Sequence, residues 1–247
     1  MVEGKIYLSS PADFNDPFDC APVNPFFRTD MLRAISDGRL TSERPAPSLL
    51  RGRPDAGDRL RRAIALDAAF QSALRQITNS VGISCFTGDP TNILMWSHYA
   101  DCHKGVCIAF SSEEHEKIVV KAKNALRFDR LFRVTYSGRR PSALTPFDRR
   151  GDGFENMFLS KAKSWSYEQE WRIVDDRGPG VYGFDPSRVV ALILGACIDS
   201  ETRSKVLDWT KERESPLVIY QARLNSSEYI IETRLYGEHN PRAELSL

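Results

Sequence analysis

One uninterrupted apolar run constrains the fold of this chain more than any other feature. Residues 189–195 read Val-Val-Ala-Leu-Ile-Leu-Gly and include no polar side chain. A strand without a polar face is typical of a sheet interior that is covered on both sides. The run is also far shorter than the roughly 20 apolar residues that a membrane helix needs. We therefore predict that residues 189–194 form a strand in the interior of a soluble protein.

Composition narrows the class of protein further. The chain has 247 residues, 41% of them hydrophobic, which is enough to bury a sizeable core. Its formal net charge is only +1, which excludes a global electrostatic argument for binding nucleic acid or an anionic membrane. The five cysteines include no CxxC pair, and neither HExxH nor a deaminase-type His/Cys/Cys spacing occurs, so we predict no metal site. We expect a single cytoplasmic domain over residues 1–247, with no membrane association.

Many short strands and a few helices are predicted along the chain. The expected strands are residues 5–9, 82–86, 106–110, 132–136, 168–174, 189–194, 217–222 and 228–233. The expected helices are residues 30–38, 58–78, 91–100, 112–123, 154–163 and 200–213, and residues 41–57 are expected to be a mobile loop. Because the strands outnumber clean βαβ units, the pattern predicts an α+β fold with a mixed, mainly antiparallel sheet flanked by helices.

The expected strand at residues 168–174 carries charged side chains at alternate positions. Residues two apart in a strand share a face at roughly 6 to 7 Å, so Glu168, Glu170 and Arg172 would line one face. The residues between them would pack on the core. Two carboxylates beside a guanidinium can orient a hydroxyl-bearing substrate and stabilise a developing cation, as cleavage of a sugar bond requires. An exposed ion cluster of little energetic worth explains the same residues.

The expected helix at residues 91–100, capped by Asp89-Pro90, concentrates aromatic and titratable groups. Trp96, His98 and Tyr99 lie within one turn. Histidine can orient or protonate a substrate near neutral pH, and the aromatic rings offer flat faces to a base or a nicotinamide ring. The alternative is that Trp96 and Tyr99 belong to the core and that His98 is an interior, hydrogen-bonded histidine.

A polar loop near the N-terminus is held between two phenylalanines, Phe14 and Phe18. Such anchoring suits a rigid loop that directs Asn15 and Asp16 at a ligand. Side-chain capping of the loop's own backbone explains the same residues.

These segments together resemble a bacterial family, the domain-of-unknown-function family 2971. The resemblance runs from residue 5 to about residue 222 and names no activity. It is carried by KIYLSSP at residues 5–11, FNDPFD at 14–19, ISCF at 83–86, MWSHYA at 95–100, HKGV at 103–106 and YEQEWR at 167–172.

More distantly, Glu168-Gln169-Glu170 resembles the ExE strand of ADP-ribosyltransferase folds. In that fold the second glutamate holds a ribose hydroxyl of NAD while nicotinamide leaves, and the first glutamate positions the acceptor. The resemblance therefore implies that Glu170 is catalytic and that Glu168 orients the acceptor, with NAD as the substrate. His98 and Tyr99 are the further catalytic candidates, and the candidates for NAD binding are Asn15, Asp16, Ser84, Trp96 and Arg172.

The resemblance also implies a cellular role for the protein and a further segment before residue 1. It implies a toxin or phage-defence effector that modifies a protein or nucleic-acid acceptor. The fold expects an Arg or His on its first strand, and members of the family usually begin with an extra segment that could hold it, so an upstream segment is expected. The alternative is a non-enzymatic ligand- or partner-binding domain. The enzyme interpretation predicts that Asn15, His98, Tyr99 and Glu170 line one cleft.

Overall fold

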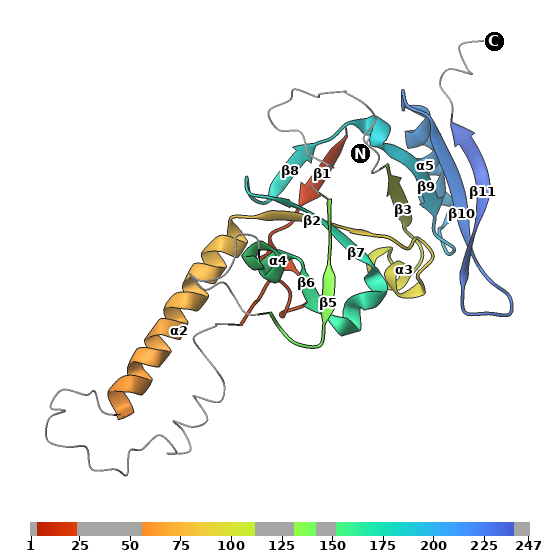
Figure 1. The fold of residues 1–247 in the computed structure, drawn as a ribbon. Coiled ribbons are helices and arrows are strands. Elements are labelled where there is room, and N and C mark those ends of the chain that lie inside the picture. The colour runs from red at the N-terminus through yellow and green to blue at the C-terminus, as the bar shows by residue number, and fades with distance from the viewer. Residues whose placement is uncertain (1–3, 24–55, 112–130, 142–151, 240–247) are drawn as a thin grey trace, which may run out of the picture.

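The structure is a computed structural model, and it describes residues 4–23, 56–111, 131–141 and 152–239 (Figure 1). Within these ranges, helices and mainly antiparallel strands confirm the predicted α+β class, although the strands form several sheets instead of one. The helices predicted at residues 30–38 and 112–123 and most of the loop predicted at 41–57 lie outside the described residues. No helix within the described ranges combines the length and the apolar character needed to cross a membrane.

The larger sheet contains the predicted central strand. It is ordered β11 (Ile231–His239), β10 (Leu217–Leu224), β9 (Val189–Leu194) and β3 (Val106–Phe110). Strand β9 runs parallel to β10 and antiparallel to β3, and Ile193 and Leu194 are buried, which confirms the prediction for this run. Val190 is an exception to the predicted burial, because its side chain is 40% exposed. Helix α5 (Ser200–Lys211) packs Val206 and Trp209 against the core that contains β9.

The second sheet is antiparallel and carries the charged segment. Its order is β2 (Gly82–Thr87), β7 (Glu170–Asp175) and β4 (Leu131–Arg133). Strand β1 (Lys5–Leu8) pairs antiparallel with β8 (Gly180–Gly183), and an isolated bridge between Ser9 and Ile83 joins β1 to β2. Strand β5 (Thr135–Ser137) pairs parallel with β6 (Ser160–Ala162).

The remaining elements are helical. In the described residues they are α2 (Ala56–Asn79), α3 (Ile93–Tyr99), α4 (Asp152–Phe158) and the short 3-10 helices η1 (Pro11–Asp13), η3 (Lys163–Glu168) and η4 (Pro186–Arg188). Helix α3 is capped by Asn92, whose side chain accepts from the amides of Leu94 and Met95, and not by the predicted Asp89-Pro90. Helix α2 extends away from the sheets in Figure 1.

Several predicted elements have bounds that differ from the prediction, because contacts with distant parts of the chain override the local sequence pattern. The strand predicted at 132–136 is divided at the buried Val134, so β4 joins β7 while β5 joins β6. The helix predicted at 154–163 ends at Phe158, because the next residues pair with β5. The strand predicted at 228–233 begins at Ile231, after a hairpin turn in which Asn225 accepts from the amides of Ser227 and Glu228.

The strand predicted at 168–174 begins two residues later. Glu168 ends η3, and Gln169 adopts a left-handed conformation at φ 45° before β7 starts at Glu170. Glu168 therefore does not share a strand face with Glu170 through simple alternation. The left-handed residue nevertheless brings both carboxylates into one cluster.

Candidate functional site

A cleft of about 1370 Å³ is lined by both larger sheets. Residues 84–87 of β2 and 106–110 of β3 form two of its walls, and α3, β1 and the loop after η1 contribute further residues. Part of the lining is aromatic, with Phe14, Phe86, Phe110 and Trp171. The charged and polar side chains of the lining include Asn15, Asp19, Tyr99, Lys161, Glu168 and Glu170. This cleft therefore combines apolar walls with a dense polar cluster, as ligand-binding sites do.

Glu170 is fixed by a fully buried arginine. Arg172 Nε donates to Glu170 Oε1 at 2.7 Å and its second amino group donates to Oε2 at 3.1 Å. The same guanidinium also forms two hydrogen bonds to the carboxylate of Asp19, at 2.9 and 2.6 Å, and one to the carbonyl of Phe158. Bidentate pairing on both sides leaves the guanidinium, and therefore Glu170, little freedom to rotate.

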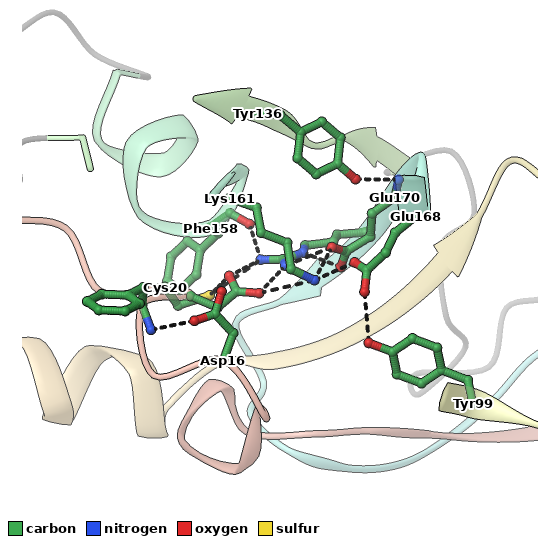
Figure 2. A network of polar contacts seen from close by, with 11 residues as sticks. Asp16, Cys20, Tyr99, Tyr136, Phe158, Lys161, Glu168 and Glu170 are labelled. Carbon is green, nitrogen blue, oxygen red and sulfur yellow. Dashed lines mark hydrogen bonds and ion pairs between the residues drawn. The ribbon is translucent and has the colours of Figure 1, made fainter. Parts of the chain in front are cut away.

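Glu168 is held by two other residues (Figure 2). Lys161 Nζ donates to Glu168 Oε2 at 2.5 Å, and Tyr99 Oη donates to Glu168 Oε1 at 2.8 Å. Lys161 also reaches Glu170 Oε2 at 2.9 Å and lies 3.7 Å from Asp19. Lys161 thus connects the two carboxylates across the left-handed Gln169.

The cluster is buried, and burial decides its energetics. Glu168, Glu170 and Arg172 are 2%, 3% and 0% exposed, so the alternative of an exposed, energetically minor ion cluster is wrong. Burial by itself would raise the pKa of Glu170, but the hydrogen bonds and charge of Arg172 and the charge of Lys161 outweigh it and lower that pKa to about 2. The neighbouring carboxylates likewise raise the pKa of Lys161 and of Arg172 against the effect of burial. Glu170 is therefore ionised at neutral pH.

Backbone contacts support the cluster from several elements. The amide of Glu170 donates to Tyr136 Oη at 2.8 Å, and the amide of Val134 donates to the carbonyl of Glu170. Thr87 Oγ1 donates to the carbonyl of Glu168 at 2.7 Å. The carboxylates are therefore positioned by β2, β5 and the residue between β4 and β5 as well as by their own segment.

Cys85 projects from β2 toward the same carboxylate. It lines the cleft and is accessible from it, yet protein atoms surround it closely. This burial, followed by the negative charge of Glu170, raises the pKa of the Cys85 thiol well above its ordinary value. A thiol in that state is a hydrogen-bond donor to Glu170 and a poor nucleophile.

Most of the predicted site residues lie at this cleft. The six that line it are Asn15, Ser84, Trp96, Tyr99, Glu168 and Glu170. Arg172 lies behind the carboxylates, and His98 is exposed and is not among the lining residues. His98 therefore does not join Asn15, Tyr99 and Glu170 in the way that the sequence predicts.

Two of the structural alternatives also have support. Trp96 is buried in a core cluster with Ile193, and its Nε1 donates to the carbonyl of Pro90. Asp16 is buried and accepts from the amide of Phe18, which is the predicted capping of the loop by its own side chain. Its second oxygen, Oδ2, has no hydrogen-bond partner within the described ranges.

Three residues of the site were not predicted from the sequence: Lys161, Asp19 and Cys85. Lys161 was placed in a helix that in fact ends at Phe158, so nothing indicated that it would point at the cluster. Asp19 ends the motif at residues 14–19, and Cys85 lies within the motif at 83–86, so the family resemblance was an available signal for both. In the described part of the chain, no group of three or more His, Cys, Asp or Glu side chains could hold a metal ion.

Comparison with known proteins supports the family resemblance. The model of the family described as "Protein of unknown function (DUF2971)" matches residues 95–173. The match confirms the predicted relation over residues 95–173, which include Tyr99, Lys161, Glu168 and Glu170, while the motifs at residues 5–19 and 83–86 lie outside it. No curated protein and no solved structure matches the chain.

Proposed function

We propose that this protein cleaves the bond between nicotinamide and ribose in NAD and transfers ADP-ribose to an acceptor, with Glu170 as the catalytic carboxylate. The observation that carries the proposal is the convergence of Glu168, Glu170, Tyr99 and Asn15 on one cleft of about 1370 Å³. Ligand pockets of about 300 to 1,000 Å³ hold drug-sized molecules, so this cleft has room for a dinucleotide.

The electrostatics of Glu170 suit this reaction. Departure of nicotinamide leaves positive charge on the ribose, and a carboxylate beside the sugar gains attraction in the transition state that it lacks in the ground state. Glu170 is ionised at neutral pH and held rigidly by Arg172, so little reorganisation is needed when that charge develops. Preorganised charge of this kind is often the largest single contribution to catalysis.

The other candidates fall into two roles. Asn15 and Ser84 line the cleft and would contact NAD, Trp96 would support the cleft wall from the core, and Glu168 would accept a hydrogen bond from the incoming acceptor. Asp16 and Arg172 would not contact NAD. Asp16 would hold the conformation of its loop, and Arg172 would hold the carboxylate of Glu170 in place. The resemblance of Glu168-Gln169-Glu170 to the ExE segment of ADP-ribosyltransferases supports this division; Glu168 ends η3 and Glu170 begins β7.

The proposal extends to a cellular role by resemblance alone. The acceptor would be a protein or a nucleic acid, and the effector would act in the cytoplasm as a toxin or in phage defence. The near-neutral formal charge of +1 gives no electrostatic preference between the two kinds of acceptor.

One observation favours a second function, non-enzymatic binding of a ligand or partner. Both oxygens of Glu170 already accept hydrogen bonds, Oε1 from Arg172 and Oε2 from Arg172 and Lys161. A ribose hydroxyl would have to share an oxygen with these donors. A saturated carboxylate of this kind also suits a cluster whose work is to shape a binding cleft.

A time course of nicotinamide release by the purified protein distinguishes the two functions. We expect release by the wild type, a loss of about 10²- to 10³-fold for Glu170→Gln, and a smaller loss for Glu168→Gln. Calorimetric titration with NAD in the same buffer reports binding, and circular dichroism reports folding of each variant. A wild type that binds NAD without releasing nicotinamide is a binding domain. One that neither binds nor cleaves NAD, or a Glu170→Gln variant as active as the wild type, rules out the transferase.

A further inference from the structure

Lys161 contacts both carboxylates of the cleft, but only Glu170 is also held by Arg172. Glu170 receives hydrogen bonds on both oxygens from Arg172, which is itself fixed by Asp19. Glu168 receives its hydrogen bonds from Lys161 and Tyr99. Removal of Lys161 would therefore leave Glu170 bidentate, while Glu168 would keep only the bond from Tyr99.

Lys161 is built into the cleft wall and is not a mobile surface cation. It is the central residue of β6, it is only 8% exposed, and its Nζ lies 5.1 Å from the centre of the Trp165 ring. Pairing of β6 with β5 fixes the backbone from which the side chain projects. Buried lysines are rare unless paired, and this one is paired with carboxylates that line the cleft.

Tyr99 alone would hold Glu168 poorly. Its side chain belongs to the last residue of α3 and is 53% exposed, so it can turn toward solvent. Without Lys161, Glu168 would also lie close to Glu170 with no cation between them, and repulsion between the like charges would drive the two apart. The short Lys161 contact at 2.5 Å is therefore what sets the direction of Glu168.

We propose that Lys161 is the positioning residue of Glu168 and thereby sets the proportion of ADP-ribose that reaches an acceptor instead of water. This inference rests on the proposed transferase activity. Glu168 presents its carboxylate to the acceptor, and Lys161 keeps that carboxylate beside Glu170. Loss of Lys161 lets Glu168 turn away, so that water takes a larger share of the cleaved NAD.

The test compares two products in the same sample. Purified protein is incubated with labelled NAD and agmatine, a small guanidine chosen because a guanidinium pairs well with a carboxylate. Nicotinamide released and ADP-ribose attached to agmatine or to the protein itself are both measured. For Lys161→Met and for Tyr99→Phe we expect the ratio of transfer to release to fall about tenfold and about threefold respectively, while Lys161→Arg should restore part of it. Lys205→Met, in an exposed ion pair with Glu201 that does not line the cleft, is the matched control.

The possible outcomes distinguish failure of the transferase proposal from failure of the inference about Lys161. No nicotinamide release by the wild type removes the transferase proposal and this inference with it. Release without transfer to agmatine or to the protein counts against Glu168 positioning alone. Loss of release itself in Lys161→Met, as expected for Glu170→Gln, would assign Lys161 to Glu170. If Lys161→Met fails to fold, Lys161→Gln carries the test, because its amide is polar enough to lie beside the buried carboxylates but has no charge, and an unchanged ratio in that variant overturns the inference.

Discussion

Arg172→Met tests whether the buried charge cluster is held by the arginine at its centre. The substitution keeps much of the side-chain volume and removes the hydrogen bonds to Asp19, Glu170 and Phe158. Lys161 then remains as the one cation among three carboxylates in this cluster, in place of two cations. Breaking a buried ion pair by removing one partner costs about 3 to 5 kcal/mol, because an uncompensated charge is left in the interior.

The pKa of Glu170 gives a second magnitude for the cluster as a whole, because Arg172 and Lys161 both lower it. Its lowering from the ordinary 4.5 to about 2 corresponds to about 3 kcal/mol, at about 1.4 kcal/mol for each pH unit. A loss of this size is a large fraction of the roughly 5 to 15 kcal/mol that stabilises most domains. Urea denaturation at neutral pH should therefore show a much lower midpoint for Arg172→Met than for the wild type, while Lys205→Met, from an exposed pair, should change stability by less than about 1 kcal/mol.

The pH dependence separates charge from packing. Because the folded-state pKa of Glu170 is depressed, its stabilising contribution is present above about pH 4.5 and is lost as the pH falls toward about 2. Without Arg172 that depression is weaker, so acid removes less stability from the variant, and the difference between variant and wild type should narrow as the pH falls from about 4.5 toward about 2. A difference below about 1 kcal/mol at neutral pH, or one that stays constant with pH, would refute the reasoning.

Three further substitutions and treatments test other parts of the structure. Gly195→Ala should lower the unfolding free energy by more than about 2 kcal/mol, as measured by urea denaturation. The reason is that the added Cβ would lie 2.2 Å from the carbonyl oxygen of His103. Gly138→Ala is the control, because its added Cβ would meet no atom within 4 Å. Asn92→Ala should cost about 1 to 2 kcal/mol in the same assay, because Asn92 caps α3 and donates to the carbonyl of Tyr167, and Asp89→Ala should cost less if the cap is Asn92. Cys85 should be alkylated slowly at neutral pH and faster as the pH rises, because burial and the charge of Glu170 raise the pKa of its thiol. Mass spectrometry measures the rate of alkylation, and rapid modification at neutral pH would contradict this prediction.

The sequence predicted the parts of this fold in which local pattern and tertiary environment agree. Most of the apolar run at 189–194 is buried as predicted, and the amphipathic pattern at 58–78 and 200–213 matches α2 and α5. The bounds near the site were less predictable. Lys161 follows a helical pattern, but pairing of β6 with β5 ends the helix before it, and such long-range pairing leaves no local signal.

The site residues show the same division. Glu168 and Glu170 were identified from their spacing, yet the left-handed Gln169 and not strand alternation brings them together. His98 was grouped with Tyr99 because they are adjacent, but adjacent helical residues point in different directions, and His98 does not line the cleft. Asp19 was missed because its partner, Arg172, lies 153 residues further along the chain.

That separation between Asp19 and Arg172 has a consequence for biosynthesis. During translation Asp19 emerges from the ribosome long before Arg172. The charge cluster therefore cannot form until most of the chain has been synthesised. Until then Asp19 stays hydrated, and the walls of the cleft from β2 and β3 have no β7 or β9 to pair with. The nascent protein is therefore expected to gain its site abruptly and late, so that incomplete translation products would lack it.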